Sequence, residues 1–265
     1  MNARFVSALA SVTVMACLTA GHNALAWGQD RVPILVELFT SEGCSSCPPA
    51  DAFLQKLDDQ PVAGAEFIVL SEHVDYWNHD GWKDPYSSSD LTDRQRNYAT
   101  RFHLNSVYTP QMVLDGCKQF LGSNVEEAQK AIAEALLQPK IALRISQVAV
   151  EQDRLRAHVE TGPLESSRGV RAVDVYVAVA LNHAESQVLR GENANRRLAH
   201  TAVVRKLFKL GKIKSGEQFV REIELKVESG SDPHNLRLVA FLQDPDSGKI
   251  IGAVTKTADG SSQQQ

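Results

Sequence analysis

The sequence predicts an α/β domain followed by an all-β, sandwich-like domain. Between residues 31 and 138, short apolar runs typical of strands alternate with segments whose apolar side chains recur at helical spacing. Beyond Pro139 the helical period disappears, and apolar residues alternate with polar ones, as at Ile141, Leu143 and Ile145. We therefore expect a three-layer α/β domain over 31–138, a β-sandwich over 140–257 and a disordered polar tail at 258–265.

The first domain is expected to follow the order β-α-β-α-β-β-α. Its elements are a strand at 34–39, a helix at 48–57, a strand at 66–70, a helix from Asp90, a hairpin at 112–120 and a last helix that ends before Pro139. Asp115-Gly116 is a type I′ turn signal within the hairpin. Ser123 and Glu126 have the spacing of a capping box for the last helix.

The second domain is expected to contain only strands. Val173, Val175, Val177 and Val179 alternate with other residues, and further strand patterns cover 219–227, 236–242 and 250–254. Asp246-Ser247-Gly248 supplies a turn between the last two of these segments.

The first 26 residues have the pattern of an export signal. Arg4 precedes an apolar run over 5–20, and Ala24-Leu25-Ala26 is a cleavage site before Trp27. The expected location is periplasmic or secreted. The alternative is a lipid-attachment box at Cys17, although Met15 is unusual in such a box.

The charge excludes some partner classes. The chain has 28 basic and 32 acidic residues, and cleavage of the leader removes one arginine and no acid. This negative balance argues against nucleic acid or an anionic membrane as partner. No later segment is long and apolar enough to span a bilayer.

The motif Cys44-Ser45-Ser46-Cys47, followed by Pro48, lies where a strand gives way to a helix. Two thiols at this spacing can share a disulfide. At a helix start the leading sulfur faces unpaired N–H groups and the positive end of the helix dipole, which favour the thiolate. The motif predicts a redox-active disulfide with Cys44 as the nucleophile, nearer solvent, and Cys47 as the resolving thiol.

Two other readings of the motif stay open: a structural disulfide and half of a zinc site. No second C-x-x-C and no H-x3-H follow. Cys117 is the only other cysteine outside the leader. If Pro110 marks the active-site end of its strand, Cys117 lies more than about 10 Å away, so we expect a free or intermolecular thiol there.

Residues 34–137 resemble the thioredoxin superfamily in their element order and in the pair Thr109-Pro110. The resemblance implies that Pro110 is cis, lies against the cysteines and leaves the backbone of Thr109 free to pair with a substrate peptide. The other reading is an ordinary trans-proline at a strand start.

Several further segments resemble the secreted family called Domain of Unknown Function 1223. They are Glu37 to Ser41, His73 to Asn78, Gly81 to Pro85 and Val107 to Gly116. That resemblance spans nearly the whole mature chain and implies a fold and a redox role without a known substrate.

Glu37 lies near the position where thioredoxins carry a buried acid that shuttles the proton of the resolving thiol. One extra residue separates it from Cys44 compared with thioredoxin. A proton relay needs a raised pKa; the other reading is a solvated or paired carboxylate.

The long segment after the second strand carries His73, Asp75, Trp77, Trp82 and Tyr86. These aromatic side chains either wall the active site and contact a peptide, or pin the insert onto the domain. A metal alternative combines Cys44, Cys47 and His73 for Cu(I) or Zn.

In the second half, residues 190–193 and 200–205 form a polar loop leading into a strand. Because Gly and Asn are ordinary turn residues, we assign no catalysis there.

The sequence therefore predicts an exported thiol-disulfide oxidoreductase that acts on protein or peptide thiols and disulfides, with a redox partner protein and no cofactor beyond the Cys44–Cys47 disulfide. Its expected site residues are Cys44, Cys47, Thr109, Pro110 and Glu37. A metallochaperone and a non-catalytic thioredoxin-like interaction protein are the alternatives.

Overall fold

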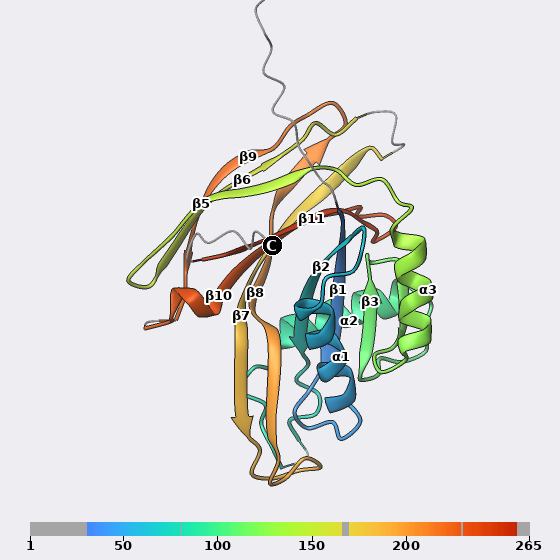
Figure 1. Cartoon of the computed structure of the whole chain (residues 1–265), viewed down its shortest axis with the longest axis vertical. Helices are drawn as coiled ribbons and strands as arrows, with labels where there is room; N and C mark the ends of the chain where they lie inside the picture. The colour runs from blue at the N-terminus through green and yellow to red at the C-terminus, as the bar shows by residue number, and fades with distance from the viewer. Residues whose placement is uncertain (1–30, 80, 166–169, 229, 259–265) are drawn as a thin grey trace, which may run out of the picture.

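The structure, a computed structural model, describes residues 31–79, 81–165, 170–228 and 230–258. It confirms the α/β class, because a large mixed sheet with flanking helices is joined by a small antiparallel sheet (Figure 1). The predicted leader, and the predicted tail beyond Ala258, lie outside the described residues.

The elements follow the predicted order. They are β1 Val32–Thr40, α1 Pro48–Asp59, β2 Ala65–His73, α2 Ser89–Arg101, β3 Gln111–Leu114, β4 Lys118–Leu121, α3 Val125–Ala135, β5 Leu143–Glu151, β6 Arg154–Thr161, β7 Ala172–Gln187, β8 Arg197–Lys214, β9 Val220–Lys226, the 3-10 turn η2 Pro233–Asn235, β10 Leu236–Gln243 and β11 Ile250–Thr257.

In the first half, β1 lies between the parallel β2 and the antiparallel β3. Side chains alternate across β1, so that Val36 and Leu38 join the core under α1 and α3, while Leu35 and Phe39 join the cores under α2. The helices thus cover both faces of these strands. Because successive side chains of β1 point to opposite faces of the sheet, neighbouring residues contact different helices.

Local sequence signals explain most element ends. Asp115 and Gly116 both have positive φ, at 48° and 65°, which confirms the type I′ turn between β3 and β4. The predicted capping box of α3 is wrong by one residue: Asn124 is the N-cap, and its side chain accepts from the backbone N–H of Glu127 at 3.1 Å. An Asn side chain caps as well as a Ser does.

The second half continues the sheet of the first. The order of the eight-stranded sheet is β11-β10-β7-β8-β2-β1-β3-β4, and β8 joins β2 where Val203 pairs with Ser71. The boundary near Pro139 therefore marks a change from mixed helix and strand patterns to strand patterns alone. The large sheet contains strands from both sides of it. The small sheet β5-β6-β9 packs on one face of β7, β10 and β11, which gives this half its sandwich-like core.

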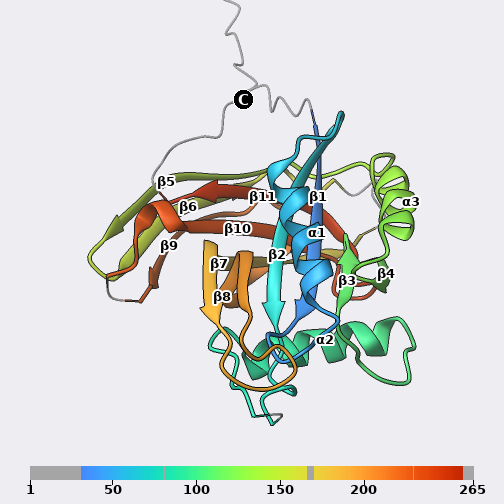
Figure 2. The same cartoon turned by 60° about the horizontal axis from the view of Figure 1, so that its bottom comes forward.

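The long hairpin of β7 and β8 positions the candidate site. Figure 2 shows it running alongside β2, with its connecting loop beside the loops that follow β1 and β2. Among the described helices, none combines the length and the hydropathy that crossing a bilayer requires.

Candidate functional site

The two cysteines of the C-x-x-C motif form a disulfide directly before α1. Their Cα atoms lie 5.4 Å apart. Cys47 is the N-cap residue, and its carbonyl oxygen accepts the first helical bonds from Ala50 and Asp51. The apolar face of α1 packs on β1, so the end of that strand fixes where the pair sits.

The expectation that Cys44 lies nearer solvent is wrong. Cys44 and Cys47 are both 0 % exposed, whereas Ser45 and Ser46 between them are exposed. The loop therefore presents its serines to solvent and turns both sulfurs inward. A partner thiol needs the surrounding segments to move before it reaches either sulfur.

A loop of the second half covers the motif. The side-chain amide of Asn193 donates to the carbonyl oxygens of Glu42 and Cys44, both at 2.9 Å, and the backbone N–H of Ser45 donates to Glu192 at 2.9 Å. Asn193 itself is fully buried. The segment to which we assigned no catalysis thus holds the backbone on both sides of Cys44.

The Thr109–Pro110 bond is cis, as predicted. Gly122 lies between Pro110 and α1, since a Cβ on that glycine would meet Pro110 at 3.2 Å and Ala50 at 3.0 Å. The structure therefore brings Thr109 and Pro110 to the same end of α1 as the cysteine pair.

The aromatic insert adjoins the site. The indole of Trp77 donates to Thr109 Oγ1 at 2.8 Å, and its Cβ leaves no room for a larger residue at Gly43. The indole of Trp82 donates to Glu42 at 2.7 Å. These contacts pin the insert onto the domain beside the cysteine loop.

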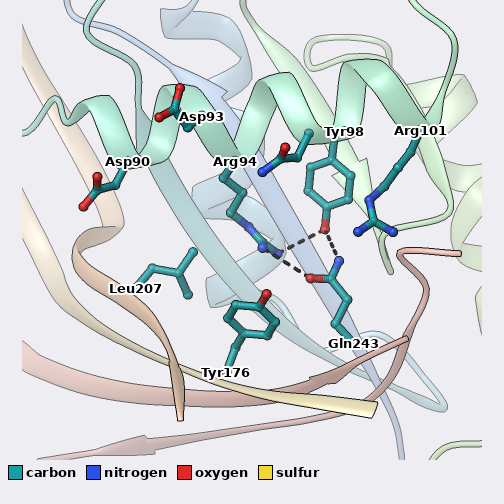
Figure 3. A pocket seen from close by; sticks show the side chains of 9 residues that line it. Asp90, Asp93, Arg94, Tyr98, Arg101, Tyr176, Leu207 and Gln243 are labelled. Carbon is teal, nitrogen blue, oxygen red and sulfur yellow. Dashed lines mark hydrogen bonds between the residues drawn. The ribbon is translucent and has the colours of Figure 1, made fainter. Parts of the chain in front are cut away.

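Glu37 does not join the cysteine pair. It lies on the face of β1 opposite α1, where it accepts from Arg94 Nε at 2.6 Å and from the Tyr98 hydroxyl at 2.6 Å. Alternation along β1 thus turns this carboxylate toward α2, with Leu35 and Phe39 on the same face. Figure 3 shows Arg94, Tyr98 and Gln243 of this network.

The network of Glu37 holds a second buried acid, Glu72. Both are 0 % exposed and they share one guanidinium, with Arg94 Nε 3.6 Å from Glu72. Burial, together with the neighbouring Glu37 carboxylate, raises the pKa of Glu72 well above its usual range. Arg94 also lines a cavity of about 250 Å³ between α2 and the strands β7, β8 and β10 (Figure 3).

His73 is placed behind the cysteine loop but is bound to an acid. Its Nδ1 lies 2.7 Å from Asp84, which also accepts from the backbone N–H of Glu42. Burial alone would raise the pKa of Asp84, but His73 and these hydrogen bonds lower it to about 2. Among the described residues no group of three His, Cys, Asp or Glu side chains is arranged to hold a metal ion.

Cys117 follows the hairpin turn as a free, exposed cysteine. Its thiol donates to the carbonyl oxygen of Leu114 at 3.7 Å. Partial burial of the sulfur and the nearby Asp115 raise its pKa. It takes no part in the Cys44–Cys47 disulfide, as predicted.

Sequence reasoning missed four residues that surround the motif. They are Glu42, Asp51, Asn193 and His200, all buried, and they come from both halves of the chain. The helical spacing from Cys47 to Asp51 was the one signal available in the sequence. Asn193 and His200 carry no local signal, because only the pairing of β8 with β2 brings them to the site.

Comparisons with known proteins cover most of the chain. Residues 35–243 match the family described as "Protein of unknown function (DUF1223)". The crystal structure of protein AGR_C_4864 from Agrobacterium tumefaciens is similar, with 26 % identity, 90 % of this chain and 100 % of that chain covered, and a TM-score of 0.69.

HBP35 of Porphyromonas gingivalis shares the fold at 14 % identity, covering 90 % of this chain and 80 % of that one, with a TM-score of 0.56. No curated protein matches the sequence significantly. The family match covers most of the chain, including the cysteine pair, the insert and the covering loop. The chain belongs to the DUF1223 family.

Proposed function

We propose that this protein is an exported thiol-disulfide oxidoreductase of thioredoxin-like design. The observation that carries the proposal is the Cys44–Cys47 disulfide directly before α1, closed in by segments from both halves of the chain. The β-α-β-α-β-β-α order of the first half supports the thioredoxin likeness. The export pattern of residues 1–26 supports a periplasmic or secreted location.

In this proposal Cys44 forms a mixed disulfide with a protein or peptide partner. The oxidised pair is attacked at Cys44 by the partner's thiolate, and in the reduced pair Cys44 attacks the partner's disulfide. Cys47 then releases the mixed disulfide. Thr109 and Pro110 face the partner chain. The helix N-terminus favours the thiolate of the reduced pair, because its unpaired N–H groups and the positive end of the helix dipole stabilise a negative charge. The partner class is a thiol or disulfide protein, and no further cofactor is required.

The experiment is disulfide exchange with insulin or a peptide disulfide. Cys44→Ser is expected to abolish turnover, whereas Cys47→Ser is expected to trap mixed disulfides that a non-reducing gel detects. Cys117→Ser is the matched control and keeps parental turnover. Parental turnover in both Cys44→Ser and Cys47→Ser would refute the proposal.

The burial of both sulfurs favours a second candidate, a non-catalytic interaction protein in which the disulfide is a structural clip. A clip resists a mild dithiol in the folded protein, because exchange requires access to a sulfur. Reduction of the native protein by dithiothreitol without loss of its near-UV circular dichroism supports the oxidoreductase. Reduction only on unfolding supports the clip.

A further inference from the structure

Five buried titratable side chains gather behind the cysteine loop. They are Glu42, Asp51, His73, Asp84 and His200, and each is less than a tenth exposed. They come from the loop after β1, from α1, from β2, from the insert and from β8. Burial of so many ionisable groups at one place is typical of a functional site.

Asp51 is the member of this cluster on the same helix as the pair. It follows Cys47 by four residues, and side chains at that spacing are neighbours on one helix face. Its backbone N–H donates to the carbonyl oxygen of Cys47 at 3.1 Å. Its Oδ1 accepts from Thr40 Oγ1 at 2.9 Å, which leaves Oδ2 directed toward β8.

His200 lies between two carboxyl groups. Its Nδ1 is 3.9 Å from Asp51 Oδ2 and its Nε2 is 3.4 Å from Glu42 Oε1. Among the described residues neither ring nitrogen makes a hydrogen bond, and the ring packs edge-to-face on His73 at 4.7 Å between centroids. A buried imidazole with both nitrogens unsatisfied requires an explanation, and proton exchange with its neighbours is one.

We propose that Asp51 and His200 hold and pass the proton that Cys47 takes up when the disulfide is reduced and releases when the disulfide re-forms. This inference rests on the exchange function proposed above. It gives the second half of the chain a part in the chemistry, because His200 belongs to β8.

The reductive step needs no reductant beyond the partner dithiol. The thiolate of a partner dithiol attacks Sγ of Cys44, the Cys44–Cys47 bond breaks, and its electron pair goes to Sγ of Cys47. Asp51 gives its proton to that sulfur and becomes a carboxylate, to which His200 returns a proton. The second partner thiolate then displaces Cys44, so the partner is oxidised to a disulfide and the pair is reduced by two electrons.

The electrostatics of the cluster suit this role. Burial raises the pKa of Asp51, against the opposing effects of His200, His73 and Thr40. Asp84 is engaged with His73, and Glu42 with Trp82. Asp51 is therefore the acid of the cluster that combines a raised pKa with a place one helical turn from Cys47.

The test follows reduction of the native disulfide by dithiothreitol from pH 6 to 9, with quenching by alkylation and thiol counting by mass spectrometry. Asp51→Asn and His200→Gln are expected to slow reduction at low pH by about a hundredfold, the lower end of general acid catalysis. The deficit should shrink as pH rises, because wild-type Asp51 then loses the proton it would donate.

Asp58→Asn is the matched control. Asp58 lies on the same helix and accepts from Thr201, next to His200, but its carboxylate pairs with Arg237. This variant is expected to keep the rate and the pH profile. If wild type is reduced and Asp51→Asn follows Asp58→Asn at every pH, the relay is overturned while exchange stands. If the folded wild type is not reduced at all, the exchange function itself fails.

A measurement on the unmodified chain serves where a variant does not fold. The titration of the Asp51 carboxyl, followed by carbon-13 NMR, is expected to have different midpoints in the oxidised and the reduced protein, because Cys47 gains a titrating proton on reduction. Equal midpoints in the two states would overturn the relay.

Discussion

Asn193 Nδ2 lies 2.9 Å from the carbonyl oxygen of Cys44, across 149 residues of sequence. The same amide reaches the carbonyl oxygen of Glu42, while Asn193 Oδ1 accepts from Arg196. One side chain of the second half thus fixes the backbone that carries the nucleophile we propose. Because both cysteines are buried under this cover, access to the disulfide depends on how firmly the loop is held.

Asn193→Asp tests this dependence. The substitution keeps an acceptor for Arg196 but removes both donors, so the carbonyl oxygen of Glu42 loses the Asn193 amide and that of Cys44 keeps only the N–H of Cys47. We expect the free energy of unfolding to fall by about 1–3 kcal/mol and reduction of the disulfide by dithiothreitol to become several-fold faster.

Glu192→Gln is the control for the same loop. Its amide oxygen still accepts from the N–H of Ser45, and Glu192 is exposed, so both quantities should stay near wild type. An unchanged reduction rate in Asn193→Asp, together with the expected loss of stability, would mean that the loop does not limit access.

Glu37→Gln separates stability from exchange. The variant removes the closest carboxylate of Arg94 but leaves Glu72 3.6 Å away, so the free energy of unfolding should fall by less than the about 3–5 kcal/mol of an uncompensated buried charge. Because Glu37 lies on the opposite face of β1 from α1, the rate of disulfide exchange should be unchanged. Chemical denaturation and the insulin assay measure the two effects.

The partly exposed ion pair of Arg144 and Glu160 is the control for that variant. Glu160→Gln should lower the free energy of unfolding by less than about 1 kcal/mol. A slowed exchange in folded Glu37→Gln, with its pH profile altered, would restore the relay that the sequence suggested for Glu37.

The buried acid Glu72 should make the stability of the protein depend on pH. Its pKa is raised in the folded state, so its contribution is fully present below its unfolded pKa, near 4.5, and is lost as pH rises toward the folded pKa. Across that window wild type should lose up to about 1.4 kcal/mol per pH unit from this group. Glu72→Gln stays neutral and should gain stability relative to wild type as pH rises.

Thermal unfolding between pH 4 and 9 checks this expectation, with the exposed Glu126→Gln as control. Parallel curves for wild type and Glu72→Gln would show that Glu72 ionises with the same pKa in the folded and unfolded chain.

Because Cys117 is a free cysteine, the number of reactive thiols per chain can be predicted. A chain that begins at Trp27 has three cysteines, of which Cys44 and Cys47 are joined, so the oxidised protein should titrate as one thiol per chain. The thiol should react slowly at neutral pH, because its pKa is raised. Alkylation followed by mass spectrometry measures both, and Cys117→Ser should show no free thiol. A disulfide-linked dimer would instead place Cys117 at an interface between two chains.

The sequence by itself determined the features that depend on neighbours along the chain. The alternation of periods predicted the helices and strands, Asp115-Gly116 predicted the hairpin turn, and the C-x-x-C spacing predicted the disulfide, because each depends on residues a few positions apart. The resemblance to known families added the cis bond at Pro110.

Only the tertiary structure decided what surrounds the disulfide. The orientation of Glu37 depends on its parity on β1, the covering of Cys44 depends on a loop 149 residues away, and the place of His200 depends on the pairing of β8 with β2. The local sequence around Asn193 and His200 would look the same whether or not β8 paired with β2, so it does not reveal that these residues reach the site. The contacts that bury both sulfurs arise from long-range strand pairing, which no local spacing encodes.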